Sequence, residues 1–98
     1  MFEFEWDESK ESANMIKHGI SFSDASTTFV DPDGFPLIDL KHSTQETRMY
    51  WIGKDETGRV LTTWFTWRED NIRIIGSAQF RKYRRLYFEN TKTKRFSL

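Results

Sequence analysis

Three arginines stand near the ends of predicted strands, where together they could hold a phosphate. Arg48 begins one such strand, Arg68 ends the segment VLTTWFTWR, and Arg73 lies near the start of the next. Pairing of the last two strands as a hairpin could bring Arg68 and Arg73 together, with Arg48 on the neighbouring strand. Guanidinium groups donate paired hydrogen bonds to phosphate and stabilise the charge that develops on it. Each arginine alone could instead face solvent or pair with an acid such as Glu46 or Glu69.

The two histidines, His18 and His42, are the side chains that could transfer a proton near neutral pH. His18 follows Lys17 at the end of a predicted helix, directly before Gly19. His42 lies in the polar segment KHSTQETR. Either could be the proton-transfer group, with Lys17 adding positive charge, although a lone histidine is more often structural or simply exposed. The sequence leaves this choice open.

The segment FRKYRRLYFEN predicts a closing helix with a basic side. Tyr83 and Tyr87 are four residues apart, so they share the side that would dock on a sheet. The cations that remain free to follow a nucleic-acid backbone are Arg81, Lys82, Arg84 and Arg85. The alternative is an amphipathic helix whose basic side is merely solvated.

The net charge of zero conceals a strong asymmetry along the chain. Residues 1–40 contain two basic and nine acidic residues, a net charge of −7. Residues 41–98 contain thirteen basic and six acidic residues, a net charge of +7. This asymmetry is consistent with a basic surface that meets an anion. The alternative is a solvated surface with a basic C-terminal helix, and charge alone favours this second interpretation.

Cofactor chemistry finds little support in the sequence. The chain has no cysteine, and two histidines are too few for a typical structural zinc site. Neither a glycine-rich phosphate loop nor a serine nucleophile motif is present. We therefore expect no cofactor and no metal. RNA cleavage without a metal remains open, because the attacking 2′-hydroxyl belongs to the substrate.

Length and hydropathy predict one soluble domain, residues 1–98, with a basic tail at 91–98 that frays. No apolar run approaches the roughly 20 residues of a membrane span. The acidic start MFEFEWDE lacks the basic region of a secretory signal. We therefore expect a cytoplasmic protein that does not bind membranes.

The order of predicted elements is β-α-α-β-β-β-α. Alternation in FEFEW predicts the first strand, and Asp7 and Gly19 bound the first helix. A second helix begins at Ser21 or Ser23 and stops at DPDG. After the short apolar segment 35–40, strand patterns occupy 48–53, 60–68 and 72–78, and a helix over 80–90 closes the chain. The result is an α+β domain with two N-terminal helices packed on an antiparallel sheet.

The chain resembles the BrnT toxins of bacterial type II toxin–antitoxin systems. The resemblance rests on the ordered segments FEWDESKESANMIKHGISF, DPDG, HSTQETRMYWIG, GRVLTTWFTWRED, IRIIGSA and RRLY. It implies a RelE-like fold and an endoribonuclease that cleaves RNA and inhibits translation. It further implies a hetero-oligomer with a BrnA-like antitoxin, which alone would contact operator DNA. The Lys17-His18-Gly19 turn, Arg48 and Arg68 match positions that the family typically keeps.

One departure from the family pattern raises a second hypothesis. The last strand usually ends Ser-Ala-Arg, and here it reads Ser77-Ala78-Gln79. Gln79 removes a cation that the family would offer to phosphate, although Arg81 could replace it. The alternative to an active ribonuclease is therefore a weak or inactive RNA- or partner-binding module that acts with its antitoxin in transcriptional autoregulation. A purely structural partner-binding domain would show no salt-sensitive affinity for nucleic acid.

Overall fold

The chain folds around one five-stranded sheet in the computed structural model, which describes residues 3–42 and 46–96. The strands are β1 Phe4–Glu5, β2 Phe35–Ile38, β3 Arg48–Lys54, β4 Val60–Arg68 and β5 Asn71–Ala78. They lie in the order β1-β5-β4-β3-β2, antiparallel except that β1 runs parallel to β5. The helices are α1 Glu8–His18, α2 Phe22–Thr27 and α3 Arg81–Phe96, with 3-10 turns η1 Thr28–Val30 and η2 Leu40–His42.

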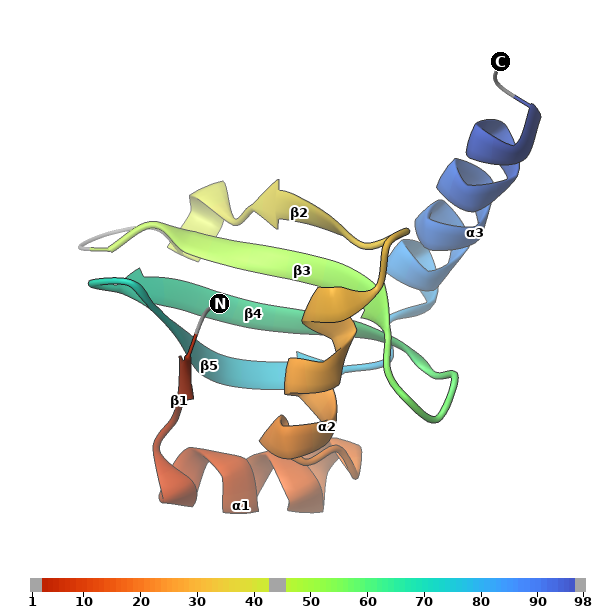
Figure 1. Cartoon of the computed structure of the whole chain (residues 1–98). Helices are drawn as coiled ribbons and strands as arrows, with labels where there is room; N and C mark the ends of the chain where they lie inside the picture. The colour runs from red at the N-terminus through yellow and green to blue at the C-terminus, as the bar shows by residue number, and fades with distance from the viewer. Residues whose placement is uncertain (1–2, 43–45, 97–98) are drawn as a thin grey trace.

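Helices cover both faces of the sheet, and each face has its own apolar cluster (Figure 1). The cluster under α1 and α2 contains Ile20, Phe22, Ala25, Leu61, Phe65, Ile72 and Ile74. The cluster under the first half of α3 contains Ile52, Val60 and Tyr87. Neighbouring residues of a strand point to opposite faces, so Val60 and Leu61 belong to different clusters. The last turns of α3 project away from the sheet (Figure 1).

The caps of the first two helices confirm the predicted boundaries. The Asp7 carboxylate accepts a hydrogen bond from the backbone N–H of Ser9 at 2.8 Å and begins α1. Gly19 ends α1 with φ 68°, a conformation that glycine adopts without a Cβ clash, and donates its N–H to the carbonyl of Met15. The hydroxyl of Ser21 caps α2.

Asn14 fastens α1 to β5 from a buried position. Its Nδ2 donates to the carbonyls of Ile20 and Ser77, both at 2.9 Å, and its Oδ1 accepts the Ser77 N–H at 3.1 Å. The side-chain amide therefore pairs with both backbone groups of Ser77, as a strand residue would. This attachment fixes the end of α1 on the sheet.

The hairpin between β3 and β4 is organised by the buried carboxylate of Asp55. Its Oδ1 accepts the backbone N–H groups of Thr57 and Arg59, and its Oδ2 accepts Nε of Arg59 at 3.0 Å. Burial opposes the charge of Asp55, but these hydrogen bonds outweigh it and hold the pKa of the carboxyl below its usual range. The turn predicted at residues 55–58 is therefore fixed by an ionised side chain.

The α+β class and the helix pair on a largely antiparallel sheet are as predicted, with two differences in the elements. The short apolar segment at 35 pairs with β3 as an additional strand, and Pro36 is tolerated because β2 is an edge strand. Helix α3 continues through Phe96 instead of ending near Asn90, so most of the predicted frayed tail is helical. Residues 43–45 of the predicted polar loop lie outside the described residues.

Candidate functional site

A row of polar side chains crosses the sheet on the face opposite α1 and α2. Arg48 of β3 lies directly opposite Thr66 of β4, and Thr66 lies opposite Arg73 of β5. Arg73 in turn pairs with Glu5 of β1. Arg68 is two residues beyond Thr66, so the alternation of β4 turns it to the same face. The register thus gathers the three predicted arginines at one end of one face.

Two of these arginines are engaged with carboxylates. Arg73 Nη1 lies 2.7 Å from Glu5 Oε2 in a partly buried pair that ties β5 to β1. Arg68 Nη2 lies 3.2 Å from Glu46 Oε1, and both of these side chains are about half exposed. An exposed pair contributes little free energy, so an incoming phosphate could displace Glu46 from Arg68. Arg73 is the less available of the two.

His42 is held by a buried carboxylate. Its Nδ1 lies 2.9 Å from Asp39 Oδ2, and its backbone N–H donates to Asp39 Oδ1. The Asp39 side chain is 5% exposed, whereas that of His42 is 52% exposed. When Nδ1 carries the proton that bonds to Asp39, Nε2 presents a lone pair outward. This arrangement orients an imidazole for accepting a proton.

The charge on Asp39 is stabilised from two sides. Burial opposes ionisation, but hydrogen bonds from His42 and from the Tyr50 hydroxyl outweigh it and lower the pKa of Asp39. Burial, together with the negative charge of Asp39, raises the pKa of Tyr50. At neutral pH the pair is therefore a carboxylate and a neutral phenol, which keeps a negative charge behind His42.

These groups line a pocket of about 200 Å³, named here the His42 pocket. Its lining residues are Asp39, His42, Arg48, Tyr50, Trp64 and Phe80. His42 and Arg48 contribute the basic groups of this lining, and the contacting rings of Trp64 and Phe80 contribute its aromatic part. A proton acceptor and a cation therefore share one small cavity.

The comparisons with known proteins place the chain in a family. The family model described as "Ribonuclease toxin, BrnT, of type II toxin-antitoxin system" matches residues 6–84. The chain belongs to the BrnT family. The matched range includes every residue of the His42 pocket and ends within α3. A toxin family of type II systems implies a cognate antitoxin.

A solved BrnT structure has the same fold. The crystal structure of the ribonuclease toxin BrnT from Brucella abortus is similar to this chain with a TM-score of 0.62 and 18% sequence identity. The alignment covers 82% of this chain and 97% of the other. At this identity the likeness establishes the fold. Among curated proteins, none matches the sequence.

His18, the second predicted proton-transfer residue, contacts two aromatic rings of the His42 pocket. Its ring packs edge-on against Trp64 at 6.1 Å and against Phe80 at 6.5 Å between ring centroids. It is partly buried at the end of α1 and is not among the residues that line the His42 pocket. Lys17, beside it, is exposed. In this BrnT-family chain His18 therefore supports Trp64, and His42 is the histidine that reaches the pocket.

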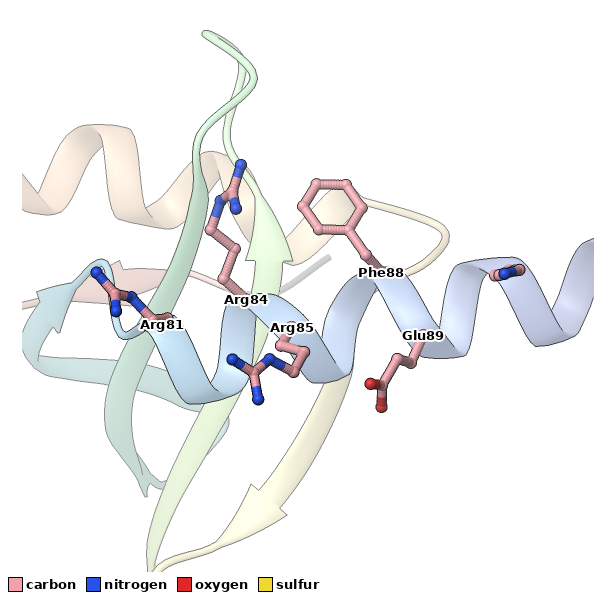
Figure 2. Close-up of a pocket in the computed structure, with 6 residues that line it drawn as sticks. Arg81, Arg84, Arg85, Phe88 and Glu89 are labelled. Atoms are coloured by element: carbon pink, nitrogen blue, oxygen red, sulfur yellow. The ribbon is translucent and has the colours of Figure 1, made fainter.

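The basic side of α3 forms a second, more open depression of about 470 Å³ (Figure 2). Its lining residues are Arg81, Arg84, Arg85, Phe88, Glu89 and Lys92. Arg84 and Phe88 project from the same side of the helix, and the guanidinium lies 5.1 Å from the centroid of the ring (Figure 2). Lys82 instead lies over the Tyr83 ring at 5.4 Å. Three of the four predicted RNA-binding residues of α3 thus share one surface.

Four pocket residues were not predicted from the sequence: Asp39, Tyr50, Trp64 and Phe80. Asp39 precedes His42 by three residues, and this spacing is a signal that could have indicated a carboxylate–histidine pair. Gln79, which replaces the usual family arginine, is exposed after β5 and does not line the pocket.

Two other kinds of site are absent from residues 3–42 and 46–96. In that part of the chain, no group of three or more His, Cys, Asp or Glu side chains could hold a metal ion. No helix there is long and apolar enough to span a membrane.

Proposed function

We propose that this BrnT-family protein is an active endoribonuclease toxin that cleaves RNA without a metal, inhibits translation and is neutralised by a BrnA-like antitoxin. The observation that supports it best is the His42 ring, held by buried Asp39 beside Arg48 in one pocket. Family membership supplies the class of reaction.

The cleavage needs two proton transfers, one from the RNA to His42 and one from His42 back to the RNA. His42 Nε2 takes the proton of the 2′-hydroxyl as its oxygen attacks the adjacent phosphorus. The bond from phosphorus to the 5′ oxygen breaks, leaving a 2′,3′-cyclic phosphate. The imidazolium of His42 returns the proton to the 5′ oxygen, which becomes a hydroxyl. Asp39 stabilises the imidazolium between the two transfers.

Arg48 and Arg68 stabilise the charge on the non-bridging phosphate oxygens during this step. Arg48 lines the His42 pocket, and Arg68 shares its sheet face. Cations aimed at developing charge in a partly enclosed site contribute more than they would in water. Lys17 does not line the His42 pocket, so its proposed role is limited to adding positive charge at the end of α1.

The basic side of α3 would extend the phosphate-binding surface beyond the pocket. Arg81, at the start of α3, is nearest in sequence to Phe80 of the pocket, and Arg84 and Arg85 continue the same surface. Lys82 and Arg73 would contribute longer-range attraction. Such contacts make RNA affinity fall steeply with salt concentration.

The test is RNA cleavage by purified protein in EDTA, with single variants alongside. We expect His42→Ala to slow cleavage about 10²- to 10⁴-fold, and Arg48→Ala and Arg68→Ala about 10²- to 10³-fold. Lys10→Ala, which removes an exposed cation at the far end of α1 from His18, is the matched control and should cleave normally. A His42→Ala protein as fast as wild type would overturn the assignment.

His18→Ala distinguishes the two histidines. As a support for Trp64, His18 should affect the affinity for RNA more than the rate of the chemical step. A His18→Ala variant with normal affinity but a greatly reduced single-turnover rate would transfer the proton role from His42 to His18.

The second candidate function is a weak or inactive module that binds RNA or its antitoxin and takes part in autoregulation. The observations that favour it are the exposed Gln79 in place of a cation and the pairing of Arg68 with Glu46. It predicts salt-sensitive RNA binding without cleavage, and formation of a hetero-oligomer whose antitoxin contacts operator DNA. Cleavage restored by Gln79→Arg would identify a weakened enzyme.

A further inference from the structure

We propose that the aromatic side of the His42 pocket, formed by Trp64 and Phe80, binds one nucleobase of single-stranded RNA beside the phosphate held by Arg48. This inference rests on the proposed function and names a subsite within it.

The two rings form a nearly parallel, fixed surface. Their centroids lie 6.0 Å apart with 18° between the ring planes. The Trp64 indole lies against the backbone of Gly76 so closely that a Cβ there would be 2.1 Å from Cζ2. His18 abuts both rings edge-on, and Tyr83 abuts Phe80 at 6.4 Å. Groups from α1, β5 and α3 therefore hold the rings in place before any ligand arrives.

Neither ring contributes to the two buried cores of the fold. Trp64 and Phe80 belong to neither of the two buried clusters, and Phe80 is 39% exposed. An exposed aromatic ring that lines a cavity beside charged groups presents a flat apolar surface to solvent. Bases of single-stranded nucleic acid stack on such rings, and neighbouring cations bind the connecting phosphates.

The position of the rings matches one nucleotide. The aromatic and the charged residues line one cavity of about 200 Å³, which is on the scale of a single base. A base on Trp64 and Phe80 would place its own phosphate toward Arg48 and His42. The proposed ligand is therefore an unpaired nucleotide, and a duplex should bind poorly.

The subsite should discriminate only weakly between the different bases. Polar groups of the pocket are already engaged, since Tyr50 donates its hydroxyl proton to Asp39 and Asp39 also binds His42. Stacking alone tolerates every base and favours those that stack more strongly. We therefore expect purines to bind better than pyrimidines, without a strict sequence requirement.

The test is binding rather than cleavage, with two 2′-O-methylated oligonucleotides of equal length. One carries adenine at every position, and the other has abasic residues throughout. Wild-type protein should prefer the adenine strand by about 5- to 140-fold, as stacking of one base implies. Phe80→Ala should abolish most of this preference while leaving the affinity for the abasic strand unchanged.

Phe88→Ala is the matched control. Phe88 is also an exposed aromatic residue of α3, 42% exposed, but it lines the open depression instead of the His42 pocket. Its removal should leave the preference for the adenine strand intact. Phe80→Leu keeps an apolar side chain of similar size without a ring, and it should lose the preference as Phe80→Ala does.

The outcomes separate this inference from the proposed function. Equal losses for both strands in Phe80→Ala, or no loss for either, would overturn the nucleobase subsite. So would a preference that disappears equally in Phe88→Ala. Loss of the preference only in the Phe80 variants supports the subsite, whether or not the protein cleaves RNA. Normal cleavage with no effect of Phe80 on binding would preserve the enzyme and remove the subsite.

Discussion

Replacing Gly76 with alanine should disturb the proposed RNA site through one methyl group that lies outside the His42 pocket. The new Cβ would lie 2.1 Å from Cζ2 and 2.2 Å from Cε2 of Trp64. Ordinary contacts between carbon atoms are about 3.5–4.0 Å, so the indole would have to move by more than an ångström. Stacking on Phe80 and the edge contact with His18 oppose that movement.

The expected cost has two parts. Overpacking of this kind destabilises a protein by about 1–3 kcal/mol, and the lower backbone entropy of alanine returns about 0.5–1 kcal/mol. The net loss of unfolding free energy should therefore lie between about 0 and 2.5 kcal/mol. Displacing Trp64 should also remove up to the full stacking contribution of one base, about 1–3 kcal/mol of RNA binding energy.

Gly34→Ala supplies the control. There the added Cβ would lie 2.4 Å from Cζ2 of another tryptophan, Trp51. Trp51 stacks on Phe29 on the sheet face that α1 and α2 cover. The steric clash is similar to that at Gly76, but it involves no residue of the His42 pocket. The two variants should lose comparable stability in urea, and only Gly76→Ala should lose affinity for the adenine strand.

The displacement itself can be observed by NMR. The chain has four tryptophans, whose indole N–H groups give separate signals, and a Trp64→Phe variant assigns that of Trp64. Gly76→Ala should shift this signal, and Gly34→Ala should shift that of Trp51. An unmoved Trp64 signal with unchanged RNA affinity would refute both the rigidity of the ring pair and its role in binding.

Three further perturbations test the supports of the fold. Asn14→Ala should lower the unfolding free energy by about 2–4 kcal/mol, because the buried N–H and carbonyl of Ser77 lose their partners. Faster hydrogen exchange at the Ser77 amide would report this loss. Tyr87→Phe removes the 2.6 Å hydrogen bond to Asp31 and should cost about 1.5–3 kcal/mol in a urea titration, with the secondary structure retained. The lowered pKa of Asp55 contributes stability that is present above about pH 4, the unfolded value, and is lost as pH falls through the lower folded value. Acid unfolding should therefore be less steep in Asp55→Asn, and equal slopes would contradict the assignment.

The caps and strand patterns were predictable because they depend on neighbours in the sequence. Asp7 and Gly19 act within one helical turn of their own positions, and the alternation in β4 is local. The basic terminal segment 91–98 is typical of a fraying tail, but α3 continues through Phe96. Helix formers without glycine or proline offered no stop signal there.

The composition of the site depends on contacts between distant segments. Arg73 forms an ion pair with Glu5 because β1 lies parallel to β5, and no local sequence pattern encodes this strand pairing. Trp64 crosses Gly76 next to an irregularity in the register of β4 and β5, and strand alternation alone cannot predict a bulge. The pair of Asp39 and His42 is the exception, because these residues are three positions apart and meet through the local turn η2.

The buried amide of Asn14 has a consequence for how the protein behaves at high concentration. An exposed strand edge can recruit a strand from another molecule and start aggregation. The outer edge of β5 is shared between β1, which pairs with Ile72 and Arg73, and Asn14, which occupies both backbone groups of Ser77. At the opposite edge, Pro36 removes a donor from β2. The Asn14 side chain thus pairs with β5 beyond the point where β1 ends. It thereby helps to prevent a strand of another molecule from adding to this edge of the sheet.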